Sequence, residues 1–121
     1  MNAHTLAQSA YGSAAATRTD RDTEYDALAR ITHRLHGLNA KSDFSSLVRA
    51  LHDNRALWSI FATDVAERTN PLPADLKARI VYLARFTGLH TRRILAGEAD
   101  TSALVEINTA VMRGLRHEAA A

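Results

Sequence analysis

The side chains most suited to chemistry are six histidines, and their surroundings argue against a metal or catalytic site. His33 and His36 are three residues apart and could share one side of a helix, but no carboxylate accompanies them at a supporting spacing. The chain has no cysteine, which excludes thiolate metal sites and cysteine nucleophiles. Ser45 and Ser46 lack a nucleophile elbow, and no phosphate-binding glycine loop occurs. We therefore expect no enzyme activity, catalytic residue, metal or cofactor.

Basic residues offer a second kind of chemistry. Lys77, Arg85 and Arg92 fall on one side of an expected helix, where such a stripe could follow a phosphate backbone. An ordinary solvated helix side explains them better, and a cation such as Arg92 is favoured near a helix C-terminus by the helix dipole. The formal net charge of +2 is modest. We therefore favour protein binding and keep nucleic-acid binding as the alternative.

These residues must be positioned by helices, because nearly every apolar pattern in the chain has a helical period. With 121 residues and 46% hydrophobic residues, the sequence predicts an all-α fold, an elongated antiparallel bundle of four main helices plus a short N-terminal helix. Residues 1–18 would hold the short helix and a mobile linker, and residues 19–121 the bundle domain. The expected helices cover residues 3–11, 21–36, from 43 towards 67, from 73 or 74 to 96, and 102–113.

Glycines mark most of the expected helix ends. Gly12, Gly37, Gly97 and Gly114 each follow a helical stretch, where glycine commonly takes the left-handed terminating conformation. Gly88 instead lies inside a periodic segment, and we expect it to allow close packing of a neighbouring helix.

The third and fourth helices carry heptad seams, and the short loop between them, with its two prolines, requires an antiparallel hairpin. Asn54 and Thr87 are the matching polar members of the two seams, so we expect this register pair to lie close together. Alternatively, Asp53 and Asn54 start a new helix, with Asn54 as its cap. The seams are Leu47, Leu51, Asn54, Trp58, Phe61 and Val65, and Leu76, Ile80, Leu83, Thr87, His90 and Ile94.

Aromatic and aliphatic side chains near this hairpin are the expected binding site for a partner protein. Tyr82, Phe86 and Leu89 form a second apolar stripe on the fourth helix, which is therefore either central in the bundle or exposed as a docking surface. Trp58 and Phe61 complete the expected site, although core packing would also explain them. The N-terminal segment, with Leu6 and Tyr11, would cover this site until the partner displaces it, or would simply be a frayed terminus.

The sequence has no apolar run of about 20 residues and no secretory signal, so we expect a cytoplasmic protein without a membrane-spanning segment.

Several ordered motifs resemble the FlaF family of flagellar biosynthesis regulators from alphaproteobacteria. They are Thr-Arg-Thr-x-Arg-x-x-Glu-Tyr at 17–25, Leu-Ala-Arg-Ile-Thr at 28–32, Ala-Leu-His-x-Asn-Arg-x-Leu-Trp at 50–58, Asn-x-Leu-Pro at 70–73 and Glu-Ile-Asn-x-x-Val-Met-Arg-Gly-Leu at 106–115.

The resemblance implies a flagellin-binding secretion chaperone in the cytoplasm, linked to flagellin synthesis through a companion regulator, with no cofactor or catalytic residue. The alternative is an RNA-binding or regulatory protein that controls flagellin synthesis.

Overall fold

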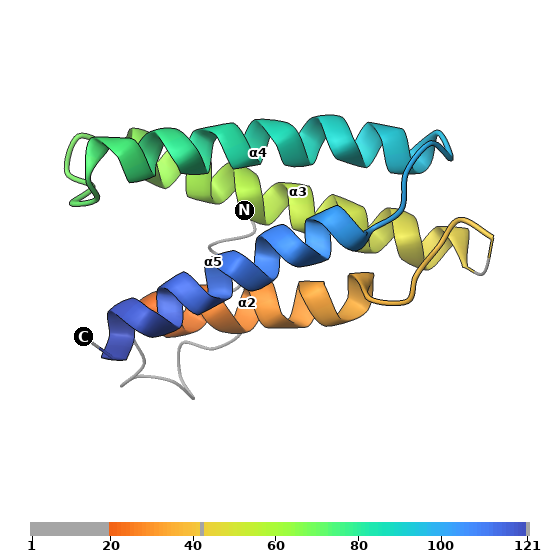
Figure 1. Cartoon of the computed structure of the whole chain (residues 1–121), viewed down its shortest axis with the longest axis horizontal. Coiled ribbons are helices and arrows are strands. Elements are labelled where there is room, and N and C mark those ends of the chain that lie inside the picture. The colour runs from red at the N-terminus through yellow and green to blue at the C-terminus, as the bar shows by residue number, and fades with distance from the viewer. Residues whose placement is uncertain (1–19, 42, 121) are drawn as a thin grey trace.

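The computed structural model describes residues 20–41 and 43–120, with side chains for residues 23–41 and 43–114. This part of the chain forms four α-helices and no strand: α2 (Asp20–Leu35), α3 (Phe44–Ala66), α4 (Ala74–Leu95) and α5 (Ser102–Ala120). Successive helices run in opposite directions along the long axis (Figure 1), which confirms the predicted all-α antiparallel bundle. The expected helix at 3–11, the linker up to residue 18, and with them Leu6 and Tyr11, lie outside the described residues.

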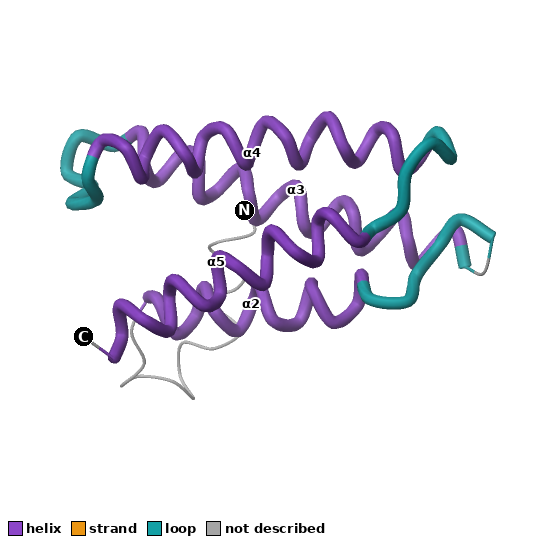
Figure 2. Tube along the Cα trace, viewed as in Figure 1, coloured by secondary structure: helices purple, strands orange, loops and turns teal. Residues whose placement is uncertain are grey.

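The four helices do not enclose the core equally. α3 packs extensively on α4 and also on α2, and α2 packs along α5, whereas α4 and α5 contact each other only briefly. Figures 1 and 2 show the reason: α4 and α5 meet at the loop that joins them and then separate towards the α3–α4 loop. The helix backbones are therefore close along three edges of the bundle and further apart along the fourth, where side chains of α4 and α5 fill the space.

The interior is built from the predicted heptad seam. All six seam residues of α3 are buried, as are Thr87, His90 and Ile94 of α4. One apolar cluster, around Leu35 and Leu51, lies among the ends of the helices where α4 turns into α5, and a second surrounds Trp58. The first half of the α4 seam is only partly covered, because Leu76, Ile80 and Leu83 lie where α5 has moved away.

Local polar contacts determine where α3 and α5 begin. Asp43 caps α3 by accepting hydrogen bonds from the Ser46 hydroxyl at 2.6 Å and from the Ser46 backbone N–H at 3.1 Å. Asp100 accepts the equivalent pair from Ser102 before α5. In each case the hydroxyl bond, helped by the backbone bond, lowers the pKa of the carboxyl group. Thr101, directly before α5, donates its hydroxyl to the carbonyl oxygen of Leu35 at 3.0 Å. This bond links the start of α5 to the end of α2.

The α3–α4 hairpin is closed by a single side chain in its loop. The Asn70 amide nitrogen donates to the Asp64 carbonyl oxygen at 3.1 Å, and its amide oxygen accepts from the Leu72 backbone N–H at 3.0 Å. These bonds join the last turn of α3 to the residues that precede α4, which begins directly after Pro73. The predicted antiparallel hairpin is confirmed.

Two of the glycines expected to end helices do so, and Gly114 does not. Gly37 and Gly97 have φ angles of 82° and 78° and end α2 and α4, as predicted. The expected end of the last helix before Gly114 is wrong, because α5 continues to Ala120. A single glycine costs a helix only about 1 kcal/mol relative to alanine, so the helix-forming residues on both sides outweigh it.

Gly88 also departs from expectation, and the difference leads to a prediction. A Cβ atom at Gly88 would meet nothing within 4 Å, so no neighbouring helix requires glycine there. Gly88→Ala should therefore stabilise the protein by about 1 kcal/mol and raise Tm by about 4 °C, since alanine is the better helix former. Thermal unfolding followed by circular dichroism measures this. Gly37→Ala, at a positive φ, is the contrasting control and should lower Tm. An unchanged or lower Tm for Gly88→Ala would contradict the prediction.

Candidate partner-binding surface

Two of the five predicted binding residues lie in the core. The Trp58 side chain is 1% exposed and donates its indole N–H to the Asn108 side-chain oxygen at 2.9 Å. Phe61 is 8% exposed and packs edge-on against Trp58, with ring centroids 5.4 Å apart. In this conformation the two rings are packed in the buried core, so they offer no surface to a partner.

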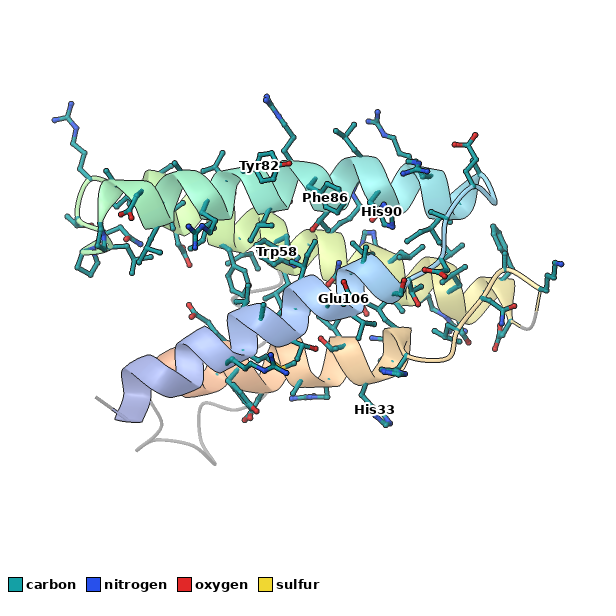
Figure 3. All side chains as sticks on the ribbon, viewed as in Figure 1. His33, Trp58, Tyr82, Phe86, His90 and Glu106 are labelled. Atoms are coloured by element: carbon teal, nitrogen blue, oxygen red, sulfur yellow. The ribbon has the colours of Figure 1, made fainter. Side chains whose placement is uncertain are left out.

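The other three predicted residues lie at the surface of α4, one helical turn apart. The Tyr82 side chain is 66% exposed and that of Leu89 is 56% exposed. Phe86, between them, is partly exposed and stacks on His90 with ring centroids 5.3 Å apart. Figure 3 shows Tyr82, Phe86 and His90 following one another along α4. We call Tyr82, Phe86 and Leu89 the α4 face.

Beside this face is the edge along which the backbones of α4 and α5 separate. Apolar side chains from α4 and α5 pack against the Trp58 cluster there and remain partly exposed to solvent. We call this set the α4–α5 edge; it comprises Ile80, Leu83, Ala84, Ile107, Val111 and Met112. Phe86 is three residues beyond Leu83 on the same helix, so the α4 face and the α4–α5 edge adjoin.

A buried polar layer lies under this surface. Asn108 of α5 donates its amide N–H to the Asn54 side-chain oxygen at 2.8 Å while accepting the Trp58 indole N–H. Asn54 lies within the continuous helix α3, so the alternative in which it caps a new helix is wrong. Thr87 is also buried, but it does not hydrogen-bond to Asn54. That Asn54 and Thr87 lie close together and set the register stays a prediction.

The partner of Asn54 was not foreseen from the sequence. Asn108 follows Leu104 by four residues and therefore lies on the apolar side of α5, among Leu104, Ile107 and Val111. An asparagine at such a position signals a buried hydrogen-bonded pair, because an unpaired buried amide is costly. Only the tertiary arrangement shows which residue on which helix completes the pair.

Two buried threonines of α4 allow a matched prediction. Thr87 Oγ1 is buried and has no hydrogen-bond partner among the described residues, whereas Thr91 Oγ1 donates to the Thr87 carbonyl oxygen at 2.6 Å. Thr87→Val replaces an unpaired hydroxyl with a methyl group of similar size and should stabilise the fold by about 1 kcal/mol. Thr91→Val loses a hydrogen bond and should destabilise it by a similar amount. Urea unfolding of both variants measures the difference, and equal effects in the two variants would contradict the assignment.

The remaining candidate groups are dispersed. In the basic stripe, Arg85 and Arg92 are exposed and Lys77 is partly buried. Across residues 20–41 and 43–120, no three histidine, aspartate or glutamate side chains come close enough to hold a metal ion. In the same part of the chain, no helix combines the length and apolar character needed to cross a membrane.

Fold and surface together define an all-α antiparallel four-helix bundle in which α4 and α5 diverge, with exposed apolar side chains on α4 beside that edge. The chain belongs to the FlaF family, since the family model described as "Flagellar protein FlaF" matches residues 7–115. This is a family of flagellar proteins and not of enzymes, and membership implies a role in flagellum biogenesis. No curated protein and no solved structure shows detectable similarity to the chain.

Proposed function

We propose that this protein is a cytoplasmic flagellin-binding secretion chaperone, which holds an amphipathic helix of flagellin before export. The observation that carries the proposal is the exposure of Tyr82 and Leu89 on α4, beside an edge where α4 and α5 separate. Family membership supports a flagellar partner. Helices that pack against one another in the assembled filament have apolar faces, and these faces must be covered while the subunit is still a monomer.

The α4 face and the α4–α5 edge suit a helix as ligand. An amphipathic helix presents apolar side chains at intervals of three and four residues, which is the spacing of Tyr82, Phe86 and Leu89 along α4. Packed alongside α4, a flagellin helix would bury Tyr82 and Leu89 and cover the apolar side chains of the edge. Complete burial of a large apolar side chain contributes on the order of 2 kcal/mol, so these two exposed residues are the strongest candidate anchors.

Direct binding of purified flagellin monomers tests the proposal. We expect a defined complex in size-exclusion chromatography, delayed filament assembly, and calorimetric binding with a negative heat-capacity change, because apolar surface is buried. The same mixture treated with ribonuclease should give the same complex. Failure to form a complex with flagellin would refute the chaperone proposal.

The RNA-binding alternative predicts a different pattern. Exposed Arg85 and Arg92 would then contribute phosphate contacts, so affinity for flagellin messenger RNA should fall steeply as salt concentration rises. Arg85→Ala or Arg92→Ala would weaken that binding and leave flagellin binding intact. A flagellin complex that disappears on ribonuclease treatment would favour this alternative.

A further inference from the structure

A second surface lies on the α3–α4 hairpin, on the flank turned away from α2 and α5. On α3, Ala50 and Leu57 belong to the clusters that include α2 residues, whereas Val48 and Arg55 lie across the heptad seam from them. Between this side of α3 and the last turns of α4 is a hollow of about 450 Å³. The apolar residues of its lining are Val48, Leu51, Ala56 and Leu95, and the polar ones are His52, Arg55, Ser59 and Thr91.

The apolar part of this hollow is open to solvent. Val48 is 38% exposed and Leu95 is 41% exposed, and Phe44, one turn before Val48 on α3, is 51% exposed. Exposed aliphatic and aromatic side chains gathered around a hollow are typical of a surface that receives apolar groups from a partner. The arrangement therefore favours a protein ligand over a phosphate backbone, which would gain nothing from Val48 or Leu95.

The ionisable side chains at the hollow are basic. Arg55 and His52 line it from α3, Arg92 precedes Leu95 by three residues on α4, and no lining residue carries a carboxylate. A complementary ligand therefore combines an aliphatic side chain with aspartate or glutamate about one helical turn away. The chain's own N-terminal segment does not fit this description, because residues 1–19 contain no acidic residue.

We propose that this hollow docks an acidic, amphipathic segment of a second partner protein, with an aliphatic side chain between α3 and α4 and its carboxylates on Arg55 and Arg92. The site is separate from the α4 face, so the protein could hold two partners at once. The proposal does not depend on flagellin binding.

Two synthetic helical peptides test the proposal on the full chain. Both have leucines at the same positions, and the flanking positions carry glutamate in one peptide and lysine in the other. In ¹H–¹⁵N spectra at low salt, the acidic peptide should shift the amide signals of His52, Arg55 and Leu95. We expect it to bind at least about ten-fold more tightly than the lysine peptide.

Two charge-reversal variants provide the matched comparison. Arg55→Glu should weaken binding of the acidic peptide about ten-fold, and Arg85→Glu, an exposed arginine of α4 outside the hollow, should leave it nearly unchanged. Both variants should keep the native Tm, because both side chains are exposed. If both variants bind the acidic peptide as tightly as the native protein and the expected amide signals still shift, the ligand's carboxylates do not contact Arg55.

Other results would overturn the proposal altogether. These are equal binding of the two peptides, shifts elsewhere on the protein, or equal losses in Arg55→Glu and Arg85→Glu. A short oligoribonucleotide that shifts the same amides more strongly than the acidic peptide would assign the hollow to nucleic acid. Self-association that shifts these amides as protein concentration rises would assign it to a second copy of the chain.

Discussion

Replacing Tyr82 and Leu89 together with glutamate is expected to lower flagellin affinity at least about 100-fold and to leave the bundle folded. Truncation of a central anchor commonly costs 2 kcal/mol or more, and a charge placed against an apolar helix adds a desolvation cost. A loss of about 3 kcal/mol corresponds to roughly 100-fold in affinity. The fold should tolerate both changes because the two side chains are mostly exposed.

Isothermal titration calorimetry with flagellin monomers measures this loss, and Val81→Glu is the matched control. Val81 adjoins Tyr82 in sequence and is 48% exposed, but it points to a different side of α4. We expect Val81→Glu to bind within about three-fold of the native protein, as is usual for a residue outside the contact. An equal loss in Val81→Glu, or native affinity in the double variant, would show that flagellin binds elsewhere even if the protein is its chaperone.

Much of the fold could be predicted because the information is local. The heptad spacing of α3 and α4 needs no knowledge of the rest of the chain, and Pro71 and Pro73 mark the only loop between them. Gly37 likewise acts within one turn of the end of α2, which it determines. The helix end expected at Gly114 was wrong because one glycine lowers helix stability only slightly. The residues on both sides of it favour the helix, and α5 therefore continues.

The candidate binding surface was less predictable because burial depends on contacts between residues far apart in sequence. Trp58 and Phe61 had the spacing of core residues and the chemistry of binding residues, and only the placement of α5 resolves the two. The separation of α4 and α5 depends on how each helix packs on the others, which the pattern within one helix does not give. Tyr82 and Leu89 lie off the seam, so the sequence left them either against a further helix or at the surface, and the structure leaves both exposed.

The second large effect concerns stability, and it depends on Asn108. This side chain bridges α5 to α3 by accepting the Trp58 indole N–H and donating to the Asn54 side-chain oxygen. Asn108→Ala leaves both groups buried without a partner and opens a small cavity. We expect a loss of about 3 kcal/mol and a fall in Tm of roughly 10 °C. Glu106→Ala, at an exposed position of the same helix, should change stability by less than about 0.5 kcal/mol.

A double-mutant cycle separates the hydrogen bond from the cavity. Trp58→Phe removes the indole donor, so part of the cost of Asn108→Ala disappears when both changes are made. The two substitutions should therefore couple by about 1 kcal/mol in urea unfolding at equilibrium. Purely additive losses would show that the Trp58–Asn108 hydrogen bond contributes little, and would assign the cost of Asn108→Ala to the cavity and to the lost bond with Asn54. The coupling matters for binding as well, because this bridge joins α5 to the base of the α4–α5 edge. If flagellin binds there, Asn108→Ala should weaken that binding too, since α5 would no longer be held in place beside α4.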